Sequence, residues 1–289
     1  MDLFLSQVFS GIATGAVYGC VGLAMVMIYT STERINFAQG EMATFSTYVA
    51  WTLMAFGLPY WAAFAATVAL SFLGGVLVQR VLLSPLRGAP EISQVIVFFG
   101  LFLIFNALSG AIWGYLPFDF PSPVKALSTG THLISAHQLF IIIVAVMMLI
   151  ALFLFFRYTS LGLCMRAAAQ NPASARLMGI RVGWMLALGW GLSAAVGAIA
   201  GIMVAPVVFL EPHMMVGVLL YAFAAALIGG IDSPPGAFIG GIVVGVLENL
   251  VGTYVVGTDL KMTVALVLII AILIFKPTGL FGSRRVARA

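Results

Sequence analysis

Long apolar stretches alternate with short polar breaks along all 289 residues of the chain. The hydrocarbon core of a bilayer is about 30 Å thick, and a helix rising ~1.5 Å per residue needs about 20 mostly apolar residues to cross it. The pattern therefore predicts an all-α, polytopic transmembrane bundle of about eight spans, forming one domain over residues 1–289. The predicted segments are 7–29, 36–56, 60–79, 92–113, 138–156, 184–206, 216–231, 236–252 and 261–275.

The two short segments 216–231 and 236–252 flank the run Gly229-Gly230-Ile231-Asp232-Ser233-Pro234-Pro235-Gly236. Prolines remove backbone donors and glycines permit tight turning, so this run predicts a broken seventh helix. Non-helical backbone at membrane depth is tolerated only where it is buried in protein or lines a water-filled cavity. The candidates for a translocation pathway or gate here are Gly230, Asp232, Pro234 and Pro235. Whether the pair crosses fully or is re-entrant stays open at this point.

Basic residues collect on every second polar break, and cytoplasmic loops of membrane proteins carry an excess of Lys and Arg. Placing the break after residue 156 in the cytoplasm leaves only Lys125 and Lys261 outside. The amino terminus then faces outward and the carboxyl terminus inward, in a bacterial inner membrane. No cleaved leader is expected, because the start lacks a basic region. The residues placed inside are Arg34, Arg80, Arg87, Arg157, Arg166, Arg176, Arg181, Lys276, Arg284, Arg285 and Arg288.

Composition excludes a soluble protein, because charged residues are 8% and apolar residues 63% of the chain, against ~25% and ~45–50% in ordinary soluble domains. The net charge of +4 is explained by orientation in the membrane, so no nucleic-acid partner is expected.

Cys20 lies in a span and Cys164 in a polar break, so neither a disulfide nor a metal site is expected. His132, His137 and His213 fall in predicted outward loops and match no metal template.

Small residues recur at helical spacing, which lets helix backbones approach closely. Packing within the chain explains these stripes better than a subunit interface does. The first two spans and the sixth and seventh also share a loose plan, which is compatible with a two-fold internal repeat. The glycines at this spacing are Gly11, Gly15 and Gly19, then Gly197 and Gly201, Gly236 and Gly240, and Gly241 and Gly245.

The longest cytoplasmic break covers residues 157–182, which exceeds the ~2–8 residues that commonly join helices in a bundle. Asn171 can cap a helix, Pro172 suits its first position, and Gly179 can end it in the left-handed conformation. The spacing predicts a two-turn helix from Pro172 to Met178.

That helix would display Leu177 and Met178 beside Arg176, as an apolar knob with a basic rim. Such a knob suits insertion into a groove of another protein. A helix lying passively at the lipid interface has the same pattern. Spacing alone leaves the two interpretations equally open.

Ionisable residues inside the spans are few, and one at the bilayer centre costs about 2.5–3.5 kcal/mol on insertion scales. Glu248 is therefore a candidate for the translocation pathway. Alternatively, it makes a structural hydrogen bond to a neighbouring helix, or it lies near enough to the outer surface to contact water. Asn36, Gln39 and Glu41 are predicted at the cytoplasmic mouth of the second span, where Asn36 and Gln39 would share a helix face and line an inner gate. Alternatively, Asn36 caps the helix and Glu41 pairs with Arg34.

Four motifs together resemble one family, and they cover nearly the whole chain in order. They are residues 35–41 (INFAQGE), 167–172 with 177–180 (AAAQNP and LMGI), 228–237 (IGGIDSPPGA) and 276–282 (KPTGLFG). The chain resembles the permease of the branched-chain amino acid type of ABC importer, in its shorter membrane subunit. It departs from the common pattern at Gln39, where a His is frequent, and at Asp232, where a Gly is frequent, which puts the identity of the solute in doubt.

The resemblance implies a non-enzymatic membrane subunit that pairs with a second, related permease, in a heterodimer rather than a homodimer. It also implies two cytoplasmic ATP-binding subunits and a periplasmic binding protein that delivers a branched-chain amino acid or a related small polar solute. The polar segment 157–182 would then dock on an ATPase. The coupling residues it implies are Arg166, Asn171, Pro172, Arg176, Leu177, Met178 and Gly179.

No stretch matches G-x-x-x-x-G-K-[ST], the loop that cradles nucleotide phosphates. ATP and Mg are therefore expected on the partner ATPases, and no cofactor on this chain. The rival reading is a self-sufficient ion-coupled carrier or channel in which Glu248 or Glu41 takes up protons. A membrane scaffold without transport is the weakest alternative, because it leaves the paired prolines without a purpose.

Overall fold

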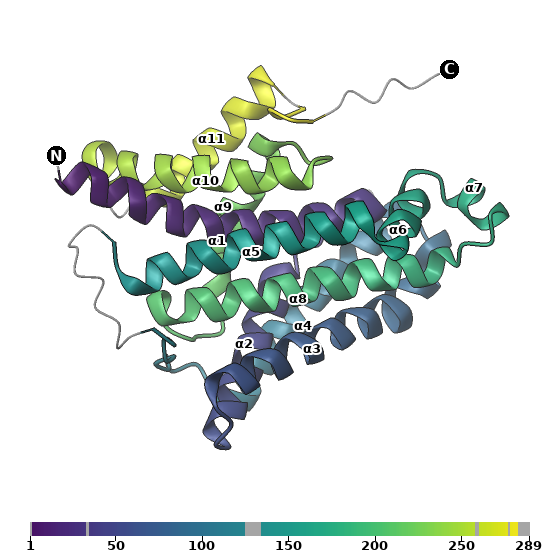
Figure 1. Cartoon of the computed structure of the whole chain (residues 1–289), viewed down its shortest axis with the longest axis horizontal. Coiled ribbons are helices and arrows are strands. Elements are labelled where there is room, and N and C mark those ends of the chain that lie inside the picture. Colours follow the sequence, from purple (N-terminus) through teal and green to yellow (C-terminus); the bar gives the residue numbers. More distant parts are fainter. Residues whose placement is uncertain (1, 33–34, 125–133, 258–259, 277, 283–289) are drawn as a thin grey trace. The chain divides into compact units, whose positions relative to one another are not determined.

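A computed structural model describes residues 2–32, 35–124, 134–257, 260–276 and 278–282. Of the residues discussed above, Arg34, Lys125, His132, Arg284, Arg285 and Arg288 lie outside these ranges. The described chain is helical and contains no strand, apart from one isolated bridge between Phe118 and Leu210. The helices are α1 (Asp2–Thr32), α2 (Gln39–Ala55), α3 (Tyr60–Val78), α4 (Glu91–Trp113), α5 (Ala136–Tyr158), α6 (Ser160–Gln170), α7 (Pro172–Leu177), α8 (Val182–Val208), α9 (Met214–Gly229), α10 (Pro234–Val251) and α11 (Lys261–Phe275) (Figure 1).

The predicted polytopic helical class is confirmed, and each predicted segment corresponds to one helix. Six helical segments of the described chain are long and apolar enough to cross a membrane, and α9 and α11 are shorter apolar helices. The number of long spans is thus slightly below the predicted eight. In α1 and α8, 89% and 67% of the most apolar window is buried, against 17–22% in the windows of α3, α4 and α5. The latter three helices therefore present their apolar side chains outward, as lipid-facing helices do.

The chain divides into two compact units, and each is described by itself. The first unit comprises Met1–Val26, Pro123–Val146 and Gly217–Ala289, and the second comprises Met27–Ser122 and Met147–Val216. The prediction of one transmembrane domain over residues 1–289 stays a prediction, and so does the two-fold internal repeat.

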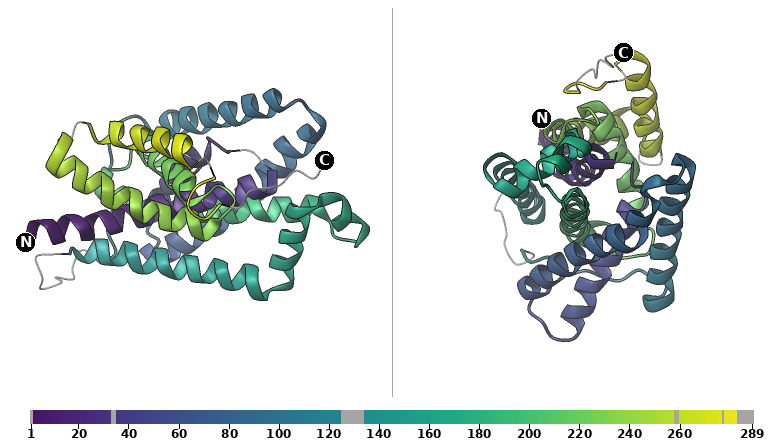
Figure 2. Two further views of the ribbon diagram at one scale, coloured as in Figure 1. Left: turned by 90° about the horizontal axis from the view of Figure 1, so that it is seen from above. Right: turned by 90° about the vertical axis from the view of Figure 1, so that its right-hand side faces the viewer.

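In the first unit, α1 and α10 lie side by side (Figures 1 and 2), and glycines on both helices form the contact between them. A Cβ on Gly11 would lie 2.7 Å from the Val246 Cα, and one on Gly15 would lie 2.6 Å from the Gly241 carbonyl oxygen. Both separations are too short for real side chains, so the helix backbones touch directly. The prediction that these glycines serve packing within the chain is confirmed for this seam.

In the second unit, α8 packs on α2 and α3 through small residues of its own. A Cβ on Gly201 would press against the Thr47 side chain and, at 2.9 Å, the Ala43 carbonyl oxygen. The buried Trp190 of α8 stacks on Phe98 of α4 with ring centroids 5.8 Å apart. These two residues belong to an apolar cluster completed by Ile28, Ala38 and Leu101.

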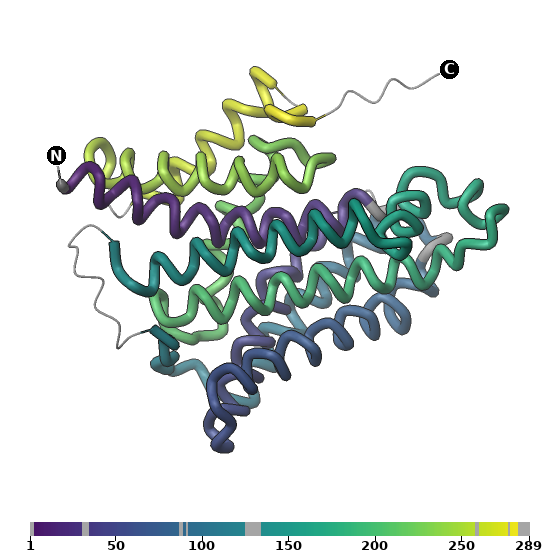
Figure 3. Tube along the Cα trace, in the orientation of Figure 1, coloured from purple at the N-terminus to yellow at the C-terminus, as the bar shows by residue number. Residues whose placement is uncertain are grey.

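The seventh segment is broken as predicted, because α9 ends at Gly229 and α10 begins at Pro234 (Figure 3). Gly230 has φ of +107°, a conformation that side chains disfavour. The Ser233 hydroxyl then accepts a hydrogen bond from the Gly236 N–H at 3.2 Å and caps α10. Pro234 and Pro235 occupy the first turn, where their missing donors cost nothing.

Residues 278–282 at the end of the described chain pair with the backbone of the last turn of α9. The Leu280 N–H donates to the Ile228 carbonyl at 2.7 Å, and the Phe281 N–H donates to the Gly229 carbonyl at 3.0 Å. Carbonyls at a helix end have no partner inside the helix. Gly279, at φ +75°, permits the approach, since a Cβ there would lie 2.6 Å from the Gly230 Cα. The tail therefore caps α9.

Candidate functional site

The segment between α5 and α8 is a helical arm, and local signals account for its form. The Thr159 hydroxyl accepts a hydrogen bond from the Gly162 N–H at 3.0 Å and starts α6. The Asn171 side chain accepts one from the Ser174 N–H at 3.0 Å and starts α7, with Pro172 in its first turn. Gly179, at φ +80°, ends it. The predicted helix is confirmed, one residue shorter than expected, whereas α6 was missed and taken as loop.

The end of α7 presents an unusually exposed apolar pair. The side chains of Leu177 and Met178 are 90% and 82% exposed, respectively, and Arg176 beside them is also exposed. By contrast, Ala175 on the same short helix is buried against Ala168 of α6 and Val182 of α8. The knob therefore stands on an anchored helix rather than on a loose loop. Arg166 is exposed on α6.

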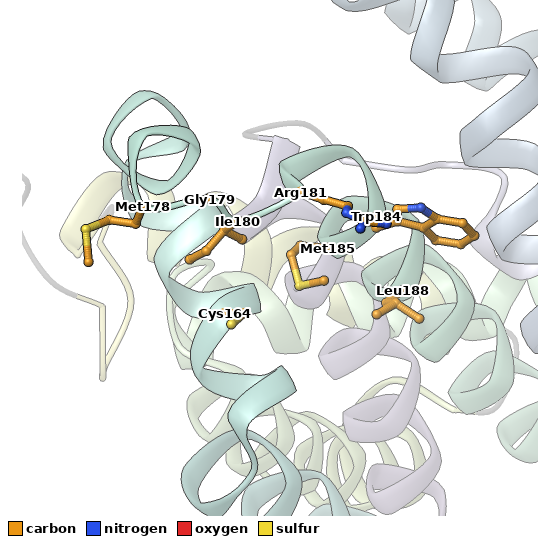
Figure 4. A pocket seen from close by; sticks show the side chains of 8 residues that line it. All are labelled: Cys164, Met178, Gly179, Ile180, Arg181, Trp184, Met185 and Leu188. Atoms are coloured by element: carbon orange, nitrogen blue, oxygen red, sulfur yellow. The ribbon is translucent and has the colours of Figure 1, made fainter.

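An open cavity of about 540 Å³ lies beside this knob (Figure 4). Apart from Arg181, its wall is mostly apolar, with Met178 at one end and Trp184 at the other (Figure 4). The Arg80 guanidinium lies over the Trp184 ring at 3.4 Å from its centroid, a cation–π contact that holds the indole in place. The full lining is Cys164, Met178, Gly179, Ile180, Arg181, Trp184, Met185 and Leu188.

Gln39 links α2 to α8 through hydrogen bonds of both its amide nitrogen and its amide oxygen. Its Nε2 donates to the Ser193 carbonyl at 3.0 Å, and its Oε1 accepts from the Ser193 hydroxyl at 3.1 Å. Asn36 lies before α2 and accepts from the Ala38 N–H at 3.0 Å through Oδ1. The expectation that Asn36 and Gln39 share a helix face is therefore wrong, because α2 begins only at Gln39.

Glu41, on the first turn of α2, is fully buried. Its Oε2 accepts a hydrogen bond from the Asn106 amide at 3.1 Å, and Asn106 also contacts His213 Nδ1 at 3.1 Å. Asn106 lies 15 residues after the start of α4 at Glu91 and 7 before its end at Trp113. The position of Glu41 at the cytoplasmic mouth of the second span stays a prediction, and its alternative partner Arg34 lies outside the described residues.

Glu248 is buried near the end of α10 and meets partners from two other helices. Tyr18 of α1 donates its hydroxyl to the Glu248 Oε2 at 2.8 Å, and the Lys261 Nζ of α11 lies 3.9 Å from Oε1. Tyr221 of α9 stacks on the Tyr18 ring with centroids 4.8 Å apart. The structural hydrogen bond, one of the alternatives left open, is therefore present. A role of Glu248 in the pathway stays a prediction.

Replacing Tyr18 by phenylalanine is expected to lower the free energy of unfolding by about 1–3 kcal/mol, because the buried Glu248 carboxylate loses one of its donors. The ring and its stacking on Tyr221 are kept, so the hydroxyl alone is tested. Thermal unfolding of the purified protein in detergent measures the change. The same substitution at Tyr254, which is 54% exposed, should leave the transition in place. Equal transitions for Tyr18→Phe and the wild type would contradict the expectation.

The predicted pathway residues are divided between the two units. Asn36, Gln39 and Glu41 belong to the second unit, while the break and Glu248 belong to the first. Glu248 lies 14 residues beyond Pro234 along α10, which is about 21 Å at the helical rise. Asp232 is half-buried at the break. Sequence reasoning missed the partners Tyr18, Asn106, Ser193, His213 and Lys261. Of these, only Asn106 gave a signal, as an amide within an apolar run.

Metal and thiol chemistry find no support in the described part of the chain. No group of three or more His, Cys, Asp or Glu side chains there could hold a metal ion. Cys20 is buried, Cys164 is half-buried, and neither is in a disulfide. The long apolar helices of the described chain define a multi-pass helical membrane protein.

Comparison with known proteins gives the family. Residues 7–273 match the family described as "Branched-chain amino acid transport system / permease component", and the chain belongs to this family. It is 30% identical to the high-affinity branched-chain amino acid transport system permease protein LivH of Escherichia coli (strain K12), over 99% of this chain and 97% of that one. It is 31% identical to the corresponding protein BraD of Pseudomonas aeruginosa, over 99% and 98%.

Among solved structures, PsaBC from Streptococcus pneumoniae in complex with Fab aligns with a TM-score of 0.49. The alignment covers 94% of this chain and 91% of that chain, at 15% identity.

Proposed function

We propose that this chain is the permease subunit of an ABC importer that moves branched-chain amino acids, or a related small polar solute, across a bacterial inner membrane. The observation that carries the proposal is the family match over residues 7–273. Relatives that align over nearly their whole length are named as high-affinity branched-chain amino acid permeases, which supports this class of solute. The chain catalyses no reaction, and ATP with Mg is bound by its partners.

The arm α6–α7 is the proposed docking site for a cytoplasmic ATP-binding subunit. Large apolar side chains exposed at 90% and 82% suit a groove on a partner protein. The buried Ala175 fixes α7 to α6 and α8, so a push on Leu177 or Met178 would be passed to α8. That connection supports a coupling element rather than a helix resting on lipid.

The remaining partners follow the same proposal. A second, related permease forms a heterodimer with this chain in the membrane. Two ATP-binding subunits bind on the cytoplasmic side, and a periplasmic binding protein delivers the solute.

The amino terminus faces outward and the carboxyl terminus inward, as the basic residues favour. Solute passes when the cavity alternates between two openings, which requires contacts that differ between the two states. The break at residues 230–233 is the proposed gate.

The test is to tag the chain, extract it gently from its native membrane and identify the proteins that accompany it by mass spectrometry. Two ATPases and a second permease are expected with it, and the purified complex should accumulate a branched-chain amino acid in vesicles loaded with ATP and Mg. Recovery of the chain alone, with transport that stops when the proton gradient is collapsed, would contradict the proposal and favour the ion-coupled carrier.

A further inference from the structure

Glu41 has one carboxylate oxygen without a partner. Its Oε2 accepts from Asn106, whereas its Oε1 is buried and makes no hydrogen bond. Among the described residues, no Lys or Arg forms an ion pair with it. Burying a carboxylate without compensation is costly, so such groups are normally paired. In this respect Glu41 differs from Glu248, which has Tyr18 and Lys261 as partners.

The surroundings of Glu41 contain more acceptors than donors. The Asn106 Nδ2 lies 3.1 Å from the Glu41 Oε2, 3.2 Å from the Pro212 carbonyl oxygen and 3.1 Å from the His213 Nδ1. An amide nitrogen carries two hydrogens. Two hydrogens therefore face three acceptors and the unpaired Glu41 Oε1. With the His213 Nδ1 as an acceptor, the described residues of the cluster lack two donors and one positive charge.

The cluster also runs from the surface inward, which a ligand site requires. His213 is exposed, Asn106 is half-buried and Glu41 is fully buried. All of these residues belong to the second unit, on α2, on α4 and in the connection between α8 and α9. The acceptors of the cluster thus extend from an exposed side chain to the buried Glu41.

We propose that Glu41, the Pro212 carbonyl and the His213 Nδ1 bind the ammonium group of a zwitterionic amino-acid solute inside the permease. An ammonium group brings three donors and one positive charge, which fits the deficit in the cluster. The inference rests on the proposed function and deepens it, because it makes the permease itself a site that selects for an amine. A neutral solute would leave the Glu41 charge uncompensated.

The experiment uses the purified importer complex in nanodiscs and three probes that differ by one group. They are L-leucine, 3-methylbutan-1-amine, which lacks the carboxylate, and 4-methylpentanoate, which lacks the ammonium. The first two are expected to raise the unfolding temperature saturably, and the acid is expected not to at equal concentration. An equal shift with the acid, or no shift with leucine and the amine, would overturn the proposal.

Two variants locate the site. Glu41→Gln keeps an acceptor for Asn106 and removes the charge, so it should abolish the shifts caused by leucine and by the amine. Thr44→Val is the matched control, one turn further along α2, because the Thr44 hydroxyl donates to the Gly40 carbonyl of its own helix. It should keep both shifts. Shifts that survive in Glu41→Gln would overturn the proposal.

If Glu41→Gln does not assemble, His213→Ala serves in its place, since an exposed side chain can be removed without disturbing the fold. The amine should then bind several-fold more weakly, and unchanged affinity would overturn the proposal. The outcomes also distinguish failure of this inference from failure of the proposed function. A wild-type complex that imports leucine, with Glu41→Gln importing it equally well, removes only this inference. A complex that imports no amino acid but binds the amine through Glu41 removes only the proposed function.

Discussion

Replacing Gly75 by valine is expected to prevent α3 from packing on α8 and to leave little folded protein. A Cβ at Gly75 would lie 2.5 Å from the Trp190 carbonyl oxygen and 2.8 Å from the Ala194 Cβ. A backbone carbonyl within a helix cannot rotate away, so the helices must separate. Overpacking commonly lowers the free energy of unfolding by about 1–3 kcal/mol. Because the collision here is with backbone, the loss should be at or above about 3 kcal/mol. The yield of monodisperse protein and its thermal unfolding in detergent measure the effect.

Gly74 is the matched control, because it precedes Gly75 in the same helix. A Cβ there would have no atom within 4 Å. Gly74→Val therefore carries the same change in helix propensity without the collision, and it should be recovered at nearly wild-type yield. Similar yields for the two variants would show that α3 and α8 do not approach this closely.

Replacing both Leu177 and Met178 by aspartate is expected to abolish transport by the assembled importer while the fold of this chain is kept. Both side chains are almost fully exposed, so the free energy of unfolding should hardly change. An apolar groove on an ATPase would instead have to bury two carboxylates, which is strongly unfavourable. Uptake and ATP hydrolysis by the reconstituted complex measure the outcome. Hydrolysis should no longer respond to solute, because the subunit that hydrolyses ATP is no longer held by α7.

The swap of Leu177→Met with Met178→Leu is the control, because it keeps the apolar character and overall volume of the knob. Uptake should remain close to that of the wild type. Normal transport by the double aspartate variant would remove the coupling role from α7 and leave it as a helix at the lipid interface.

The elements that could be predicted from sequence are those with local causes. The predicted segment 261–275 matches α11 at both ends, because the apolar run alone defines it. The break after α9 and the start of α7 were also predicted, since Pro234, Pro235, Asn171 and Pro172 act within one turn of their own position. The length of α6 escaped prediction, because Ser160–Gln170 mixes apolar and polar residues without a span-like run.

The contacts of the polar clusters could not be predicted, because their partners are remote in sequence. Glu41 and Asn106 are 65 residues apart, and Tyr18 and Glu248 are 230 apart. Apolar periodicity identifies the buried face of a helix but not the helix that packs on it. The spacing of Asn36 and Gln39 was misread for a similar reason: an i, i+3 relation has meaning only inside a helix, and α2 had not yet begun.

The pairing of the carboxyl-terminal tail with α9 has a consequence for biogenesis. The carbonyls of Ile228 and Gly229 receive their hydrogen bonds from Leu280 and Phe281, which are synthesised about fifty residues later. While α10 and α11 leave the ribosome and enter the bilayer, the end of α9 has no such cap, so insertion must precede its completion. A chain that stops before Leu280 would insert every helix and still leave this helix end unfinished.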